Sequence, residues 1–139
     1  LEVSRGAAFG DLDLDGRVDI LVTNNGGPVR LLRNVTPGAG HWLRLRLVQP
    51  ERNRRAIGAA VRIDLPGQPP IIRRVRSGGS YLSASDDGLY MGLGSAASPV
   101  TLTVTWPDGT QQRVTGLAVD REHVRLILVR PRQRADSVR

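Results

Sequence analysis

The sequence has no cysteine and no lysine, few aromatic residues and no long hydrophobic run. Without cysteine, the chain forms no disulfide framework and no cysteine-ligated metal site. Because no run of about eighteen apolar residues occurs, the sequence predicts no transmembrane helix. Aromatic residues make up only 4% of the chain, so we expect a core built mainly from Val, Leu, Ile and Ala.

What the sequence does contain favours short strands. Its 139 residues suit one domain, or one domain and a fragment of another. Sixteen Gly and nine Pro residues indicate many tight turns. The formal net charge is +7, and all twenty basic residues are Arg. This balance permits binding to nucleic acid, an acidic glycan or an acidic protein partner, and it selects none of them.

Short apolar runs bounded by turn residues predict an all-β fold. Residues 41–48 show the pattern most clearly, because Leu side chains alternate there with Trp and Arg side chains, as in a half-buried strand. A single helical turn is expected near residues 117–123. The predicted strands are 6–10, 18–24, 29–35, 41–48, 57–65, 70–76, 89–93, 100–106, 110–115 and 124–129.

The chain divides at Pro37-Gly38-Ala39-Gly40, which has the composition of a linker. Residues 1–36 are predicted to form a three-stranded β-meander, and residues 37–130 an antiparallel β-sandwich or barrel-like module. Residues 131–139 are basic and almost free of apolar groups, which is typical of a frayed tail. Because the chain starts at Leu1 and enters a motif almost at once, we expect a processed form or the C-terminal piece of a longer protein.

A nine-residue segment carries carboxylates at a regular spacing. Calcium takes six to eight oxygen ligands, and alternate carboxylates on a tightly curled chain can converge on one ion. Gly16 suits the sharp turn that such a loop needs, and the backbone carbonyl of Arg17 can supply a further oxygen. We therefore predict one Ca²⁺, held by Arg17 together with the carboxylates of Asp11, Asp13, Asp15 and Asp19.

The alternatives for this segment are a solvated turn, an EF-hand, a Mg²⁺ site and a catalytic metal. Four carboxylates this close repel one another unless a cation lies among them, which disfavours a solvated turn. An EF-hand requires a bidentate Glu where this chain has Val22, and helices where it has strands. Mg²⁺ prefers a tighter octahedron. No His or nucleophile lies nearby in the sequence, so we expect a structural ion.

The segment 6–24 resembles an FG-GAP/VCBS-type repeat in the order Gly-Ala-Ala-Phe-Gly-Asp-Leu-Asp-Leu-Asp-Gly-Arg-Val-Asp-Ile-Leu-Val-Thr-Asn. Such repeats are the calcium-binding blade units of integrin-like β-propellers. The unit here would be incomplete, because a single blade cannot bury both of its faces. The resemblance implies a carbonyl ligand at Arg17 and side-chain ligands at Asp11, Asp13, Asp15 and Asp19.

From His41 onward, an ordered series of motifs resembles an ASPIC/UnbV domain, which commonly follows such repeats at the C-terminus of exported proteins. The resemblance implies an extracellular or cell-surface location, with the periplasm as an alternative, and it implies no known activity. The motifs are His41-Trp42-Leu43, Asn53-Arg54-Arg55-Ala56-Ile57-Gly58-Ala59, Arg76-Ser77-Gly78-Gly79-Ser80-Tyr81-Leu82-Ser83, Gly92-Leu93-Gly94 and Trp106-Pro107-Asp108-Gly109.

Two further groups of residues are candidate binding sites. Several arginines could line one face of the sheet and bind carboxylate, sulfate or phosphate, or could simply form a solvated face. A polar loop could hold a ligand, or could be a structural crossover whose hydroxyls satisfy backbone groups. The loop residues are Ser80, Tyr81, Ser83 and Asp86, and the arginines are Arg44, Arg46, Arg62, Arg73, Arg74 and Arg76, with Arg52, Arg54 and Arg55 at the rim.

No catalytic constellation stands out, since His41 and His123 are isolated and no Ser has a recognisable His–Asp partner. We expect a non-enzymatic, calcium-stabilised extracytoplasmic β-module for adhesion, ligand binding or assembly. The alternatives are a structural subunit of a larger surface complex or filament, and a basic binder of acidic polysaccharide or nucleic acid. The expected partners are other protein chains or upstream repeats of the same protein. Nucleic acid is disfavoured because no aromatic residues are interleaved with the arginines.

Overall fold

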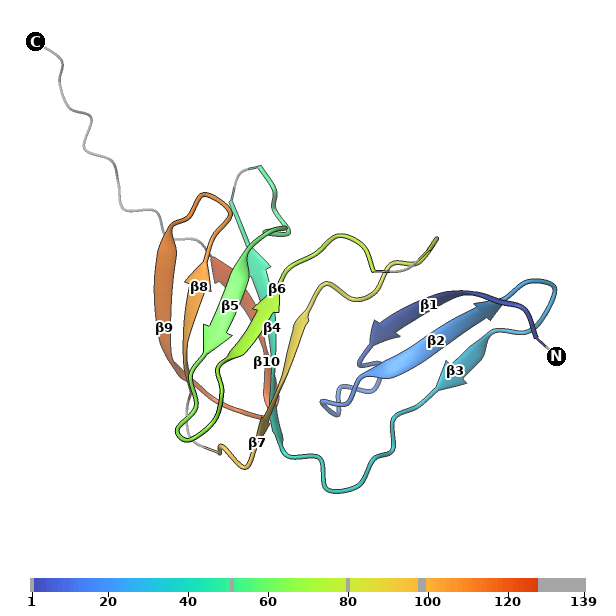
Figure 1. The fold of residues 1–139 in the computed structure, drawn as a ribbon, viewed down its shortest axis with the longest axis horizontal. Helices are drawn as coiled ribbons and strands as arrows, with labels where there is room; N and C mark the ends of the chain where they lie inside the picture. The colour runs from blue at the N-terminus through green and yellow to red at the C-terminus, as the bar shows by residue number, and fades with distance from the viewer. Residues whose placement is uncertain (1, 51, 80, 98–99, 128–139) are drawn as a thin grey trace, which may run out of the picture.

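The chain is an all-β protein, as the sequence predicts (Figure 1). The computed structural model describes residues 2–50, 52–79, 81–97 and 100–127. Within these ranges, ten strands form three sheets and no helix occurs, so no helix there could cross a membrane. The molecule has two parts: a three-stranded sheet formed by the first strands, and a sandwich formed by the other seven (Figure 1).

The first sheet is the predicted β-meander. It consists of β1 (Ser4–Gly10), β2 (Asp19–Asn24) and β3 (Arg30–Leu32), which pair antiparallel in the order β1-β2-β3. The turn between β2 and β3 contains Gly26, whose φ of 70° lies in the left-handed region that favours glycine. The turn therefore forms where the sequence predicts it, and β3 is shorter than the predicted strand.

The second part is a sandwich of two sheets (Figure 1). One sheet has the order β10-β4-β7 and contains β4 (His41–Val48), β7 (Leu89–Gly94) and β10 (Arg121–Ile127). The other sheet has the order β6-β5-β8-β9. Its strands are β5 (Ala60–Ile63), β6 (Ile71–Arg74), β8 (Val100–Thr105) and β9 (Gln111–Leu117).

Of the two predicted alternatives, the module is the sandwich, and its sheets do not close into a barrel within the part of the chain that the structure describes. It differs from the prediction in two respects. β10 runs parallel to β4, whereas the sequence predicts antiparallel pairs throughout. The helical turn expected near residues 117–123 is wrong, because β9 reaches Leu117 and β10 begins at Arg121. The predicted basic tail, residues 131–139, lies outside the described residues.

Alternation along β4 builds the core of the sandwich. Leu43, Leu45 and Leu47 are buried in one cluster with apolar side chains from β5, β7 and β8. Burying one such side chain stabilises the fold by about 1.5–3 kcal/mol relative to leaving it exposed. Trp106 is also buried in this cluster, and its indole N–H donates to Oε1 of Gln112 at 3.2 Å. The aliphatic core that the composition predicts is therefore confirmed, and it includes one buried Trp.

The two parts of the molecule also meet away from the linker. The segment before β7 runs beside β1, toward which it reaches in Figure 1. The N–H of Asp86 donates to the carbonyl of Phe9 at 3.0 Å, and the N–H of Phe9 donates to Oγ of Ser85 at 3.2 Å. Because β1 leads directly into the aspartate-rich loop, these bonds hold that loop beside the sandwich.

Candidate metal centre

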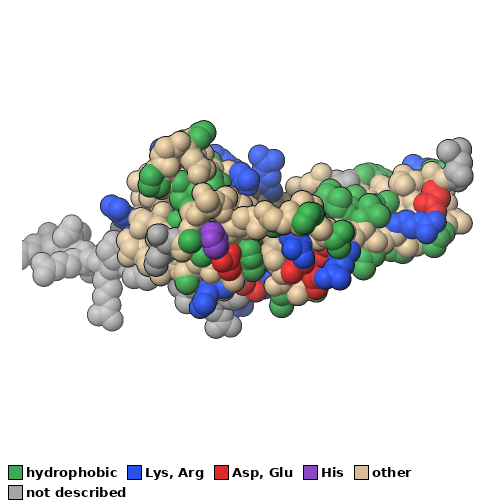
Figure 2. Space-filling model, turned by 90° about the horizontal axis from the view of Figure 1, so that it is seen from below, with side chains coloured by type: hydrophobic (Ala, Val, Ile, Leu, Met, Phe, Trp, Pro, Cys, Tyr) green, Lys and Arg blue, Asp and Glu red, His purple; other side chains and the backbone are tan. Residues whose placement is uncertain are grey.

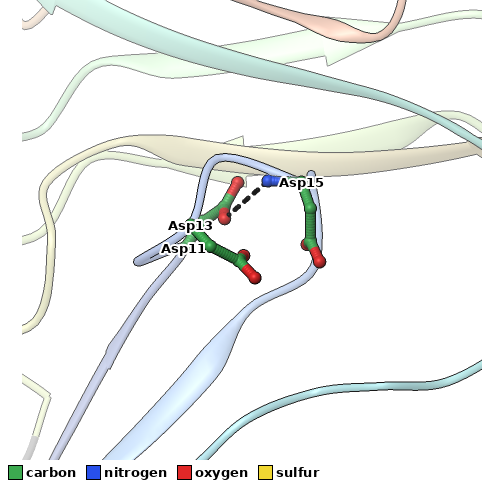
Figure 3. Close-up of side chains that lie close together, drawn as sticks. All are labelled: Asp11, Asp13 and Asp15. Atoms are coloured by element: carbon green, nitrogen blue, oxygen red, sulfur yellow. Dashed lines mark hydrogen bonds between the residues drawn. The ribbon is translucent and has the colours of Figure 1, made fainter.

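The loop between β1 and β2 brings three of the predicted ligands together. Asp11, Asp13 and Asp15 each offer a carboxylate oxygen, and these oxygens lie within 4.8 Å of one another (Figure 3). Asp11 is buried, Asp15 is half-buried and Asp13 is exposed. Side chains at alternate positions normally diverge in an extended chain, so their convergence requires the chain to curl.

The curl of this loop depends on Asp11. Its Oδ1 accepts the N–H of Asp15 at 3.1 Å, the dashed line in Figure 3, and its Oδ2 accepts the N–H of Gly16 at 2.9 Å. Leu14 and Gly16 adopt left-handed φ values of 60° and 86°. A left-handed conformation costs a residue such as Leu about 1–2 kcal/mol. The left-handed conformation of Leu14 therefore strains the backbone of the loop. Such strain clusters at sites where proteins bind ligands.

The three carboxylates fit a calcium ion. Calcium–oxygen distances are about 2.3–2.6 Å, so two oxygens on opposite sides of one ion are about 5 Å apart. Oxygens within 4.8 Å of one another can therefore all reach the same ion. In the structure, arginines supply the opposing charge, since Arg17 pairs with Asp15 and Arg33 pairs with Asp13. Hard oxygen ligands of this kind suit calcium better than a transition metal.

Asp19 is not one of the three converging carboxylates. Its Oδ1 accepts the N–H of Asn34 at 2.8 Å, and its Oδ2 accepts the N–H of Leu12 at 3.1 Å. These two bonds, with the larger effect from Asn34, hold the pKa of the Asp19 carboxyl below its usual value. The side chain of Arg17 also reaches this region, donating from Nε to the carbonyl of Asn34 at 2.9 Å. Asp19 therefore ties the base of the loop to the segment after β3.

Gly16 places the loop directly on the second part of the molecule. A Cβ at this position would overlap the indole ring of Trp42, which lies at the start of β4. The position therefore requires glycine for two independent reasons, its left-handed φ and the absence of space for a side chain. The sequence indicates the first reason and gives no sign of the second.

Gly16→Ala is expected to destabilise the protein by about 2–4 kcal/mol, because a left-handed Ala costs about 1 kcal/mol and overpacking adds about 1–3. Gly26→Ala is the matched control, since Gly26 has a φ of 70° and no atom within 4 Å of an added Cβ. It should lose only about 1 kcal/mol. Urea unfolding measures both losses, and equal losses would show that packing on Trp42 contributes nothing.

A cluster of ion pairs, centred on Asp86, lies beside the loop. Arg44 donates to Oδ2 of Asp86 from Nε at 3.0 Å and from Nη2 at 2.6 Å, and Arg46 reaches Oδ1 at 3.3 Å. Arg44 also pairs with Glu122 at 2.9 Å, and its guanidinium lies 5.2 Å from the centroid of the Tyr90 ring. Its side chain is only 9% exposed, so the buried charge depends on these partners.

Tyr90 connects this cluster to the aspartate loop. Its hydroxyl donates to Oδ2 of Asp86 at 2.6 Å and accepts the N–H of Asp11 at 3.1 Å. Burial and then the bond to Asp86 raise the pKa of Tyr90 to about 12, so the hydroxyl keeps its proton at neutral pH. Sequence reasoning missed Tyr90, because Asp11 is 79 residues away and no local pattern relates the two.

Acid is expected to destabilise the protein through Asp86. Burial raises the pKa of this carboxyl, but the hydrogen bonds from Tyr90 and Arg44 outweigh it and leave the pKa below the usual 3.8. The contribution of Asp86 is therefore complete above about pH 4 and is lost as pH falls through the lowered folded-state pKa. Thermal midpoints measured between about pH 6 and pH 2 should fall in that window. Asp86→Asn should flatten the profile, and an equally steep profile in the variant would refute the assignment.

The predicted basic residues do not share one face, so that prediction is wrong. Arg44 and Arg46 belong to the sheet of β4, whereas the other four lie on or just after strands of the opposite sheet. The inward faces of both sheets are filled by the apolar core, which directs the arginines of β4 and β5 to opposite surfaces. The four arginines of the second sheet are Arg62, which pairs with Asp64 at 2.7 Å, and Arg73, Arg74 and Arg76.

The predicted ligand loop divides into separate parts. Ser80 lies outside the described residues. Tyr81 is 69% exposed, and Oγ of Ser83 donates to the carbonyl of Tyr81 at 2.9 Å, which is the backbone-satisfying role that we considered as the alternative. Asp86 points into the ion-pair cluster, where its oxygens are already engaged.

Both histidines have partners within the sandwich. Nδ1 of His41 and Oδ2 of Asp120 are 2.6 Å apart, and Oδ1 of Asp120 accepts the N–H of Trp42 at 3.1 Å. Nε2 of His123 lies 2.7 Å from the carbonyl of Ala118. The contacts of Asp120 join the start of β4 to the turn before β10, and the contact of His123 joins β10 to the same turn, so both histidines have packing roles.

One known protein family matches the part of the chain that forms most of the sandwich. A family model described as ASPIC and UnbV matches residues 49–133. The matched region includes β5 to β10 and the Trp-Pro-Asp-Gly turn, and it begins after β4. The aspartate loop therefore lies outside the match. No curated protein matches the chain.

Proposed function

The chain belongs to the ASPIC and UnbV family, whose model matches more than half of it, and on this premise we propose that it is a non-enzymatic β-module stabilised by calcium. It works at the cell surface or in the extracellular space as a unit for adhesion, ligand binding or assembly. The observation that carries the proposal is the convergence of Asp11, Asp13 and Asp15 within 4.8 Å.

The order of elements supports an FG-GAP/VCBS-type repeat in the first part. The carboxylates lie on a loop that joins two antiparallel strands, β1 and β2, as such a repeat requires. A bound ion would supply positive charge among the three carboxylates and so cross-link the loop. The residues of the chain do the rest: Asp11 shapes the loop, Asp19 closes its base and Gly16 seats it on Trp42.

The charges around the loop favour a location rich in calcium. Affinity rises with the number of carboxylate ligands, and here Arg17 and Arg33 compete for two of the three that converge. We therefore expect a dissociation constant of about 10⁻⁴–10⁻³ M, the range of extracellular modules rather than of intracellular sensors. An affinity in this expected range would favour a function outside the cytoplasm.

Thermal melts with calcium and with chelator test the proposal. At a calcium concentration about ten times the dissociation constant, binding to the folded state adds about 1.4 kcal/mol, which corresponds to a midpoint about 3–6 °C higher. Asp13→Asn should reduce this shift, because the variant binds calcium more weakly. Asp64→Asn likewise replaces one aspartate that pairs with an arginine, but on the sandwich, and should retain the shift. No shift in the wild-type protein, or the same shift in Asp13→Asn, would refute the proposal, and a parallel series with Mg²⁺ tests selectivity.

A second observation favours a subunit of a larger surface complex or filament. Large apolar side chains of the first sheet face solvent on both of its faces, and Figure 2 shows hydrophobic side chains gathered over this part of the molecule on the face in view. Exposed patches of this kind mark surfaces that another protein covers. The partners proposed are other protein chains or upstream repeats of the same protein. Leu21 and Leu31 lie on one face of the sheet, and Phe9 and Leu32 lie on the other, with between 38% and 57% of each side chain exposed.

Light scattering over a range of protein concentrations tests the assembly function. The wild-type chain should associate as concentration rises, because association removes the exposed apolar side chains from water. Leu31→Asp should weaken this association, while Leu82→Asp should not, because Leu82 is 87% exposed but lies outside the first sheet. A wild-type chain that stays monomeric throughout would contradict association through this surface.

A further inference from the structure

A pocket of about 200 Å³ lies between β6 and β7. Its walls are residues 74–79 and 84–89, together with Arg55. We infer that this pocket binds the oxyanion of a small ligand, a carboxylate, sulfate or phosphate group. Sites for drug-sized molecules occupy about 300–1,000 Å³, so this pocket suits one acidic group, or the acidic end of a longer molecule.

Arginine side chains at this pocket outnumber the carboxylates that could pair with them. Asp86 and Asp87 form part of its wall, but each is already paired with arginine side chains, at distances from 2.6 to 3.4 Å. Arg74 and Arg76 also line the pocket, and neither has a carboxylate partner in the described part of the chain. Positive charge is therefore left over for a ligand, after the pairing of the two aspartates with Arg44, Arg46 and Arg55.

The loop of Ser77, Gly78 and Gly79 makes the backbone accessible. No atom lies within 4 Å of a Cβ added at either glycine, so a ligand can approach the main chain closely. Backbone N–H groups and a serine hydroxyl are donors that an oxyanion accepts. Guanidinium groups add paired bonds to two oxygens of a carboxylate or phosphate. The pocket thus combines charge, donors and room of the kind that oxyanion recognition needs.

This inference does not rest on calcium. None of the pocket residues belongs to the aspartate loop, although Asp86 is linked to the N–H of Asp11 through the hydroxyl of Tyr90. Titrations with calcium and with chelator can therefore separate the two proposals. If calcium fails to bind while the oxyanion binds, the calcium proposal fails and the pocket proposal holds.

Calorimetric titration with sodium sulfate, sodium phosphate and sodium glucuronate, at constant ionic strength, tests the inference. The anion that binds most tightly identifies the class of oxyanion. Arg76→Gln is expected to weaken that binding at least about tenfold, because a charge-assisted pair is lost. Arg113→Gln is the matched control, since Arg113 is also exposed and lies on β9, at the opposite edge of the same sheet.

Two results would overturn the inference. One is the absence of binding in all three arms. The other is an equal loss in Arg76→Gln and Arg113→Gln, which would show that the ligands respond only to net charge. Arg74→Gln provides an independent check, because its loss should match that of Arg76→Gln if both side chains reach the same ligand. Thermal midpoints of the variants confirm that each is folded.

Discussion

Asp11→Ala is expected to weaken calcium binding by about 100-fold or more. Asp11 both offers an oxygen to the ion and shapes the loop, since its carboxylate accepts the N–H groups of Asp15 and Gly16. Its loss therefore removes one ligand and frees the two others to diverge. Calcium titration by calorimetry, with the wild-type protein in parallel, measures the effect.

Asp13→Asn is the informative comparison for that variant. Asp13 is exposed and pairs with Arg33, and within the described residues no backbone N–H donates to its carboxylate. Its replacement should weaken calcium binding while the melting midpoint in chelator stays near that of the wild type, whereas Asp11→Ala should lower both. If Asp11→Ala binds calcium as the wild type does, the loop is not a metal site.

Asp86→Ala is expected to lower the free energy of unfolding by about 3 kcal/mol. The substitution leaves the buried guanidinium of Arg44 with Glu122 as its remaining ion-pair partner. It also removes the acceptor of the Tyr90 hydroxyl, which holds the N–H of Asp11. Urea unfolding at neutral pH gives the stability, and the calcium affinity of the variant should fall as well.

Asp64→Ala is the control for burial. Asp64 also pairs with an arginine, Arg62, but both side chains are more than half exposed. Exposed pairs contribute little to stability, so this variant should unfold close to the wild-type denaturant midpoint. Similar losses in the two variants would mean that the cluster around Asp86 has no special structural role.

The strands are the part of the fold that the sequence predicts best, because strand formation depends on local alternation and turn residues. The alternating Leu side chains of β4 predict which of its faces enters the core. The Asn and Gly residues after β2 predict the turn at Gly26. The parallel pairing of β10 with β4 could not be predicted in this way. This pairing depends on which edge of the sheet is free, and the residues of the two strands do not indicate that edge.

The same distinction applies to the candidate site. Asp11, Asp13 and Asp15 could be predicted because their convergence follows from a spacing within five residues. Asp19 matches that spacing, yet it binds backbone from the segment after β3. Alternation places Arg44 on the outer face of β4, and it is nevertheless buried, because a remote segment bearing Asp86 covers it.

A high-resolution crystal structure of the protein grown in calcium would decide whether the aspartate loop is a calcium site. One ion should be bound by carboxylate oxygens of Asp11, Asp13 and Asp15, with six to eight oxygen ligands at about 2.3–2.6 Å. Arg17 and Arg33 should release their carboxylates. Density showing only water between splayed carboxylates, with both arginines still paired, would contradict this prediction.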